Sequence, residues 1–444
     1  KVSSVIKTYQ PYFIRRMPMR KLTALAAFVV FACMFTSFAQ AETLSPEEKS
    51  MAISQRTEIR LLIEDLGNHR EAQAAAVEKL VEIGGSAVPM LIRYSDHENE
   101  HIRAYVALVL GRIGDTRGIE PLANLLGDSS YYVAYYAEKG LQELAHANME
   151  AALLDVVDHL KTKLTVDSDV VRSRAVVVLI DLNPIDLWET MVGLLKDDYW
   201  KVRADAAKAL GGISTATDLE QKKQIAQALE NALADNEWQV VRSVALAAGF
   251  YIHDSGMYII AEEDSEGNFK GYKNSPNKEI TYKLIDRLVR LIEHSEPTVR
   301  SAAALSLGKV WITKAEEKEA AVMGALIKGL DDKNEDVIIS SAISLGKNGN
   351  KNAVGALIER LDLDKHSPMV INYMIDALRK RTLKSFGYQG YPLLEESEDD
   401  PIDTPDEFDA ALDKLEQDRR QAIEKWKTWW QGNSNAFEVN PTIR

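Results

Sequence analysis

The stretch HIRAYVALVLGRIGDTRGIEPLANLLGD, residues 101–128, sets the fold because variants of it recur along most of the chain. Ile102, Val106 and Leu110 stand at i, i+4 and i+8, so they form one apolar stripe on a helix. Two glycines then end that helix, and Pro121 suits the first turn of a second one. A helix pair this short cannot cover both of its apolar faces, so similar pairs must stack on either side. We therefore predict an array of helical repeats.

The first helix of each repeat can be aligned on one apolar anchor residue. The position four residues after the anchor is small in most copies, and the position eight residues after it is usually leucine, a rule that Gly249 breaks. Small residues let neighbouring helix axes approach closely, while the leucine fills the seam between layers. The nine anchors are Ala72, Ile102, Val133, Val171, Val202, Val241, Val299, Val337 and Val370.

Two copies show the repeat most clearly, over residues 202–211 and 299–308: Val-Arg, then Ala, then Leu-Gly. This pattern resembles the HEAT-like repeats of the bilin-lyase type, and the resemblance covers about residues 70–380. We expect this chain to be an exported bacterial protein with such repeats. The resemblance implies an all-α, right-handed solenoid of the ARM/HEAT type with about nine helix pairs. Such repeats occur in scaffolds, adaptors and a few enzyme subunits, so the resemblance specifies the fold and leaves the function open.

The first 41 residues have the composition of a secretory signal peptide. They hold six Lys or Arg and no acid, and an apolar run over 22–38 is followed by Ala39-Gln40-Ala41, which suits cleavage. We expect a mature chain that begins at Glu42 and is exported, most often to the periplasm of a Gram-negative-type bacterium. An uncleaved anchor, secretion, and lipidation at Cys33 are the alternatives.

Charge and cysteine content exclude several classes of function. Cys33 is the only cysteine, so a cleaved chain would have neither a disulfide nor a thiol nucleophile. Without the six leader cations, 47 basic residues face 67 acidic ones, a net charge of −20. That balance argues against binding to nucleic acid or to an anionic membrane surface, and no membrane span is expected after cleavage.

The repeat array, residues 70–382, is flanked and interrupted by other segments. A helix over 42–69 is expected to cap the first repeat. Residues 253–280 are expected to form a β-hairpin inside the sixth repeat, either as a contact element or as a tolerated loop. The acidic stretch 383–405 predicts a solvated linker. A Trp-rich helix within 406–444 is expected to seal the last repeat or to anchor a partner.

Arginine directly follows the anchor in five copies, and an acid usually precedes the anchor. The pattern predicts a ladder of ion pairs and carbonyl caps that joins successive repeats along one edge, with a ligand-binding row as the alternative. The arginines are Arg103, Arg172, Arg203, Arg242 and Arg300.

The stretch His97-Glu98-Asn99-Glu100-His101 matches the H-E-x-x-H pattern of zinc proteases. That chemistry needs both histidines on one continuous helix and a third ligand from elsewhere. Here the residues occupy a turn between repeats, so we interpret the match as chance, with His97 and His101 as weak surface metal ligands at most. The chain contains no G-x-S-x-G and no phosphate loop. We therefore predict no catalytic residue, metal or cofactor.

Aromatic residues gather close to the anchors of three repeats. They either lean on the next repeat or, if exposed, provide anchors for a protein or glycan partner. These candidate partner-binding residues are Tyr131, Tyr132, Tyr135 and Tyr136 in the third repeat, Trp200 in the fifth and Trp238 in the sixth.

An elongated helical array offers a long surface and no closed cavity, which suits protein binding better than small-molecule chemistry. We therefore expect a non-enzymatic, exported interaction or scaffold protein with a protein partner. The resemblance implies a second possibility, an accessory or lyase-like subunit of an enzyme system. Because bilin attachment takes place in the cytosol, export counts against this second possibility. A cell-envelope spacer without a saturable partner is a third.

Overall fold

The computed structural model describes residues 46–68, 70–147, 149–166, 168–182, 187–213, 218–254, 257–263, 269–310, 312–388 and 405–439. The expected leader over 1–41 and most of the expected acidic linker over 383–405 lie outside these residues.

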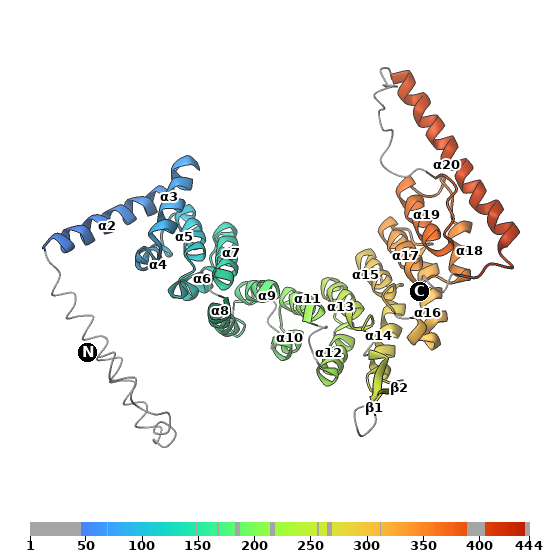
Figure 1. The fold of residues 1–444 in the computed structure, drawn as a ribbon, viewed down its shortest axis with the longest axis horizontal. Coiled ribbons are helices and arrows are strands. Elements are labelled where there is room, and N and C mark those ends of the chain that lie inside the picture. The colour runs from blue at the N-terminus through green and yellow to red at the C-terminus, as the bar shows by residue number, and fades with distance from the viewer. Residues whose placement is uncertain are drawn as a thin grey trace.

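The helices stack in two layers along a curved, elongated solenoid, which confirms the predicted all-α ARM/HEAT-type architecture (Figure 1). The first helices line the inner, concave side of the curve, and the second helices cover the outer side. The first helices are α3 (Arg70–Ile83), α5 (Glu100–Ile113), α7 (Tyr131–Ala147), α9 (Asp169–Leu182), α11 (Trp200–Ile213), α13 (Trp238–Tyr251), α15 (Pro297–Leu307), α17 (Glu335–Asn348) and α19 (Pro368–Thr382). The second helices are α4 (Val88–Tyr94), α6 (Ile119–Leu125), α8 (Met149–Lys163), α10 (Trp188–Leu194), α12 (Leu219–Ala232), α14 (Lys278–Leu291), α16 (Glu316–Gly329) and α18 (Lys351–Glu359).

Glycine at one repeated position, nine residues after the anchor, lets the first helices pack closely. A Cβ on Gly111 of α5 would lie 2.4 Å from the Cα of Gly140 in α7. A Cβ on Gly308 of α15 would lie 2.6 Å from the Cβ of Ser344 in α17. Neither distance leaves room for a side chain, so the absence of one sets the spacing of these layers.

The sixth repeat shows that its alignment on Val241 was wrong by one residue. With Val240 as the anchor, Gly249 stands nine residues later, where the other repeats have their glycine, and a Cβ there would lie 2.7 Å from Ser306 Oγ. Val241 then occupies the position that holds arginine elsewhere. Two adjacent buried valines made either alignment plausible from the sequence, and Gly249 does not break the pattern.

Four repeats lack this glycine, the first and the ninth, with Val81 and Arg379 in its position, and the third and fourth. Gln142 stands in its position in α7, and Ile180 stands there in α9. As a result, α7 and α9 pack much more loosely than α5 and α7 do. The Gln142 amide bridges this wider α7–α9 seam by donating a hydrogen bond to the Asp181 carboxylate.

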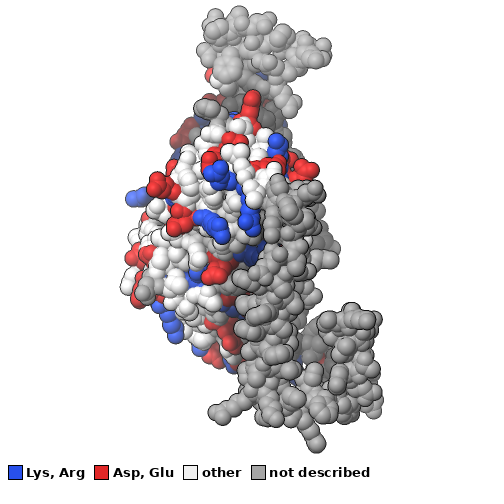
Figure 2. Space-filling view, turned by 90° about the vertical axis from the view of Figure 1, so that its left-hand side faces the viewer, with Lys and Arg blue, Asp and Glu red and all other residues white. Residues whose placement is uncertain are grey.

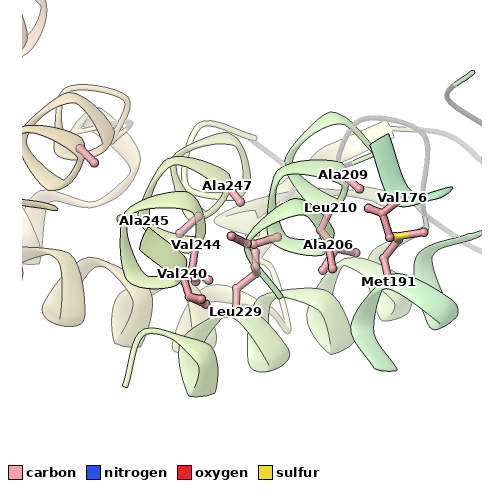
Figure 3. Packing of buried hydrophobic residues seen from close by; sticks show 14 of the residues in the cluster. Val176, Met191, Ala206, Ala209, Leu210, Leu229, Val240, Val244, Ala245 and Ala247 are labelled. Carbon is pink, nitrogen blue, oxygen red and sulfur yellow. The ribbon is translucent and has the colours of Figure 1, made fainter. Parts of the chain in front are cut away.

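One continuous hydrophobic core runs between the two layers from Ile59 to Trp426. Figure 3 shows its central part, where Leu210 and Val244 of the first helices point toward Met191 and Leu229 of the second helices. Each repeat therefore shares its core with both neighbours.

Two strands form the predicted hairpin between α13 and α14. Strand β1 (Ile259–Glu263) pairs antiparallel with β2 (Phe269–Asn274). An irregularity between Glu262 and Glu263 interrupts the pairing. The rings of Phe269 and Tyr272 lie 5.2 Å apart, and both side chains are largely exposed.

Further helices cover both ends of the core. Helix α2 (Pro46–Asp65) contacts the first repeat through the buried Ile63. Helix α20 (Pro405–Asn433) lies against α18, where Trp426 is fully buried and meets the Phe386 ring edge-on at 4.7 Å. Within the described ranges, no helix combines the length and apolar character needed to cross a membrane.

Candidate functional site

The predicted tyrosines of α7 form one aromatic cluster together with Tyr105 of α5. The Tyr132 ring lies 4.9 Å from that of Tyr136 and 6.4 Å from that of Tyr105, and its hydroxyl donates to the Tyr105 hydroxyl at 3.2 Å. Tyr135 meets Tyr136 edge-on at 5.6 Å. Tyr131 begins the same helix. We call these five residues the tyrosine patch.

Helical spacing explains why these rings meet. Tyr132 and Tyr136 are four residues apart on α7, so they lie on the same face of the helix. Tyr105 occupies the position in α5 that Tyr136 occupies in α7, three residues after the anchor, so the two rings face each other across the layers. Tyr105 was not among the predicted residues, although this shared position could have revealed it.

The tyrosine patch combines exposed rings with ordered ones. Tyr131 is 75% exposed and Tyr135 is 41% exposed, whereas the other three rings are half-buried. Burial, together with hydrogen bonds to Tyr105 and Tyr136, raises the pKa of Tyr132 above its usual range, so its hydroxyl stays protonated at neutral pH. The half-buried rings thus form a rigid, uncharged support for the two exposed ones.

A charged group borders the tyrosine patch at the α7–α9 seam. The Arg174 guanidinium lies 5.1 Å from the centre of the Tyr131 ring, and its Nη1 lies 2.8 Å from Glu138 Oε1. Burial raises the pKa of Glu138, and the nearby Arg174 opposes that rise. The seam therefore places a cation directly beside an exposed aromatic face.

A second polar group, on α9 and α11, resembles a nucleophile with its base but cannot act as one. Lys201 Nζ donates to Ser173 Oγ at 2.6 Å and to Asp205 Oδ2 at 2.9 Å. Ser173 is 2% exposed, and the lysine is paired with a carboxylate. A charged ammonium has no lone pair with which to accept the serine proton, and a buried hydroxyl cannot reach a substrate.

Neither Trp200 nor Trp238 joins the tyrosine patch. They begin α11 and α13, at the position that Tyr131 has in α7. The Trp200 ring contacts Tyr199 at 5.9 Å and is half-buried, and Trp238 is 37% exposed. Equivalent positions in the repeats thus carry aromatic residues on separate layers, and among the predicted aromatic residues only those of α7 gather into a cluster.

His97 and His101 have different partners. His97 precedes α5, where its Nδ1 accepts the Asn99 N–H at 3.1 Å and its ring stacks on Tyr94 at 5.5 Å. His101 lies in the first turn of α5, edge-on to Tyr132 at 5.9 Å. The pair therefore lacks the helical geometry of a zinc-protease site. No three metal-binding side chains gather anywhere in the described part of the chain.

Four of the five arginines form the predicted ladder. Arg203, for example, donates two hydrogen bonds to the Asp235 carboxylate, at 2.7 and 2.9 Å, and a third to the Asp197 carbonyl oxygen at 2.8 Å. Arg242 is the exception, because the one-residue shift in the sixth repeat puts Val241 at this position. The ladder pairs are Arg103–Asp128, Arg172–Asp197, Arg203–Asp235 and Arg300–Asp332.

Charge is mixed around the N-terminal end of the solenoid. Figure 2 shows acidic and basic side chains interspersed with uncharged ones there, without a large field of one sign. A ligand of the tyrosine patch would therefore be recognised by local contacts rather than by long-range attraction.

Comparison with known proteins assigns the repeats. Residues 59–153 and 157–248 match the family model for HEAT repeats. The chain therefore contains HEAT repeats over these residues. The break between the two matches falls in α8, next to the loose α7–α9 seam.

Two relatives of this chain come from Nostoc sp. (strain PCC 7120). The bilin biosynthesis protein PecF is 28% identical over 189 residues, which are 41% of this chain and 88% of PecF. The phycocyanobilin lyase subunit beta is 28% identical over 182 residues, 41% of this chain and 77% of that protein. Among solved structures, a Kap121p mutant has a TM-score of 0.53 at 14% identity, covering 76% of this chain and 39% of that one. That last likeness concerns the solenoid fold alone.

These relatives contradict the expectation of a non-enzymatic scaffold. They are named as a bilin biosynthesis protein and a lyase subunit, and most of the length of each is matched. The expectation was wrong because it relied on the absence of a catalytic motif. A solenoid that contributes a surface to an enzyme system needs no such motif, so its absence cannot separate the two functions.

Proposed function

We propose that this protein is an accessory subunit of a lyase-type enzyme system, and that its tyrosine patch binds a bilin for transfer to a client protein. The observation that carries the proposal is the match that spans 88% of PecF. Because this chain is expected to be exported, we propose that its client protein is exported as well.

The chemistry of the tyrosine patch suits such a ligand. A bilin is a chain of conjugated pyrrole rings with carboxylate side chains. Tyr131 and Tyr135 offer exposed aromatic faces for the rings, and Arg174 offers a guanidinium for a carboxylate at the edge of the same surface. Because Cys33 in the expected leader is the only cysteine, a thioether bond would form on a thiol of the client. The role of this chain would then be to hold and orient the ligand.

A spectroscopic titration tests this proposal. Mature protein from residue 42 onward is titrated with biliverdin or phycocyanobilin, and the visible absorbance bands are followed. We expect a saturable band shift. The double variant Tyr131→Ala/Tyr135→Ala should weaken binding about tenfold, since each aromatic contact contributes roughly 0.5–1.5 kcal/mol.

The matched control is Tyr272→Ala, which removes an equally exposed tyrosine from the hairpin. It should leave the titration unchanged. If neither bilin shifts its absorbance, or if the control loses as much affinity as the double variant, the tyrosine patch is not a bilin site.

A further inference from the structure

Three lysines occupy one repeated position at the C-terminal ends of the last three first helices. Lys309 follows α15, Lys347 lies in the last turn of α17, and Lys380 lies in the last turn of α19. In α7 and α9 the same position holds Glu143 and Asp181. Arg112 holds it in α5, so basic residues stand on both sides of this acidic pair, and the last three first helices carry three lysines on successive layers. We call Lys309, Lys347 and Lys380 the lysine row.

The lysine row has no acidic counterpart in the described part of the chain. None of its ammonium groups forms an ion pair with a described carboxylate, although the whole chain carries a net charge of −14. Asp376, four residues before Lys380 in the sequence, pairs with Arg379 at 3.2 Å.

Packing holds these side chains in place. Lys309 Nζ lies 3.8 Å from the centre of the Phe250 ring, and its Cδ would be 3.3 Å from a Cβ on Gly249. Lys380 crosses Gly346 of the preceding helix in the same way, at 3.7 Å. The stems of Lys309 and Lys380 thus lie against glycines of the preceding helix, and Lys347 and Lys380 are exposed whereas Lys309 is half-buried.

Two adjacent members of the lysine row repel each other. Burial, followed by repulsion from Lys347, lowers the pKa of Lys309. A lysine at a helix C-terminus is favourable by itself, because it faces the unpaired carbonyl groups. The favourable interaction with the helix C-terminus explains each lysine singly, but it does not explain why three lysines align on successive layers. A bound anion would relieve the repulsion between their charges.

We propose that the lysine row binds a short, extended acidic segment of a partner protein with a carboxylate at every third residue. Packed helix layers are about 8–10 Å apart. An extended chain of the polyproline-II type rises about 3.1 Å per residue with three residues per turn, so every third side chain faces the same side and successive ones are about one layer apart. Phe250, 47% exposed, offers an apolar contact beside the first lysine. A nucleic acid fits less well, because Glu143 and Asp181 would repel a long polyanion that followed the same rim. This proposal does not depend on bilin binding.

Fluorescence anisotropy with labelled peptides tests this inference. One peptide carries three aspartates separated by Gly-Ser pairs, and a second has the same composition with the aspartates contiguous. We expect the spaced peptide to bind more tightly, and its binding to weaken with added salt. The triple variant Lys309→Gln/Lys347→Gln/Lys380→Gln should lose about tenfold or more in affinity.

Two further variants make the result independent of folding defects. The control Lys79→Gln/Lys196→Gln/Lys208→Gln removes the same charge from exposed lysines outside the row and should bind normally. The charge reversal Lys309→Glu/Lys347→Glu/Lys380→Glu should instead bind a peptide with lysine at every third residue. Equal affinity for both acidic peptides, equal affinity for a single-stranded oligonucleotide, or equal loss in the control would overturn the proposal.

Discussion

The residue at one repeated position sets how closely two neighbouring first helices of this solenoid pack. Where the residue nine positions after the anchor is glycine, as at Gly111 and Gly308, the backbone of the next helix fills the space of a side chain. Where it is Gln142, the helices separate and a polar side chain bridges them. Helix spacing in this chain is thus controlled at one position per repeat.

Replacement of Gly111 by alanine should therefore destabilise the protein by about 1–3 kcal/mol, because the new Cβ would overlap the Gly140 backbone. The control is Gly324→Ala in α16, where a Cβ meets nothing within 4 Å. There we expect a gain of about 0.5–1 kcal/mol from helix propensity. Urea denaturation followed by circular dichroism measures both. Similar effects at the two sites would refute the importance of the close approach.

At the scale of elements, arginines and aspartates join successive loops. Each ladder arginine reaches carbonyl groups of its own loop and the aspartate of the next one, as Arg203 does with the Asp197 carbonyl and Asp235. His97 and His294 take the place of the aspartate in two loops, and their Nδ1 atoms accept the same kind of backbone N–H. The repeat preceding His294 has Val241 in place of arginine, so an aspartate there would lack its partner.

The ladder predicts a pH dependence. Burial would raise the pKa of Asp235, but hydrogen bonds from Arg203 and the Glu237 N–H outweigh it and lower the pKa. A lowered folded-state pKa contributes stability above the unfolded value of about 3.9, and this contribution is lost as the pH falls through the folded value. Asp235→Asn should therefore lower the free energy of unfolding by about 1–3 kcal/mol at pH 7, with a smaller difference at about pH 3.

Urea denaturation of both proteins at the two pH values measures this effect. Asp158→Asn is the matched control, since its side chain is 75% exposed and pairs at 3.4 Å with Lys161 in the same helix. It should change stability by less than about 0.5 kcal/mol. A loss for Asp235→Asn that stays constant with pH would mean that ionisation of this carboxyl is not involved.

At the scale of the whole molecule, each repeat shares its core only with its neighbours. The helix that covers each end therefore stabilises mainly the repeats next to it. Trp426 closes the C-terminal end, and in a stacked array every repeat contacts only its neighbours. Damage at one end should therefore spread through few layers.

Trp426→Ala should accordingly reduce hydrogen-exchange protection in α18 and α19 while leaving α5 and α7 protected. Hydrogen exchange read by mass spectrometry measures all four helices in one experiment. Trp238→Ala, at a partly exposed position in the middle of the array, serves as the control and should not affect α18 or α19. Loss of protection in α5 and α7 would show that the array unfolds as a single cooperative unit.

The sequence predicted what depends on periodicity and missed what depends on contact between layers. Apolar anchors such as Ile102 and Val202 placed the helices, and the arginine pattern placed four of the ladder pairs. In the sixth repeat the two valines allowed a shift by one, which only packing resolves. Tyr105 belongs to the tyrosine patch and Arg174 borders it, both from neighbouring helices, so a search within one helix could not find them.

The loose α7–α9 seam makes the stiffness of this solenoid uneven. A load or ligand that alters the curvature bends the array most at loosely packed seams, of which this is one. The tyrosine patch lies on the α7 side of that seam, and Arg174 lies on the α9 side. The contact between Tyr131 and Arg174 crosses this seam, so a change in the angle between α7 and α9 changes the distance between the ring and the guanidinium.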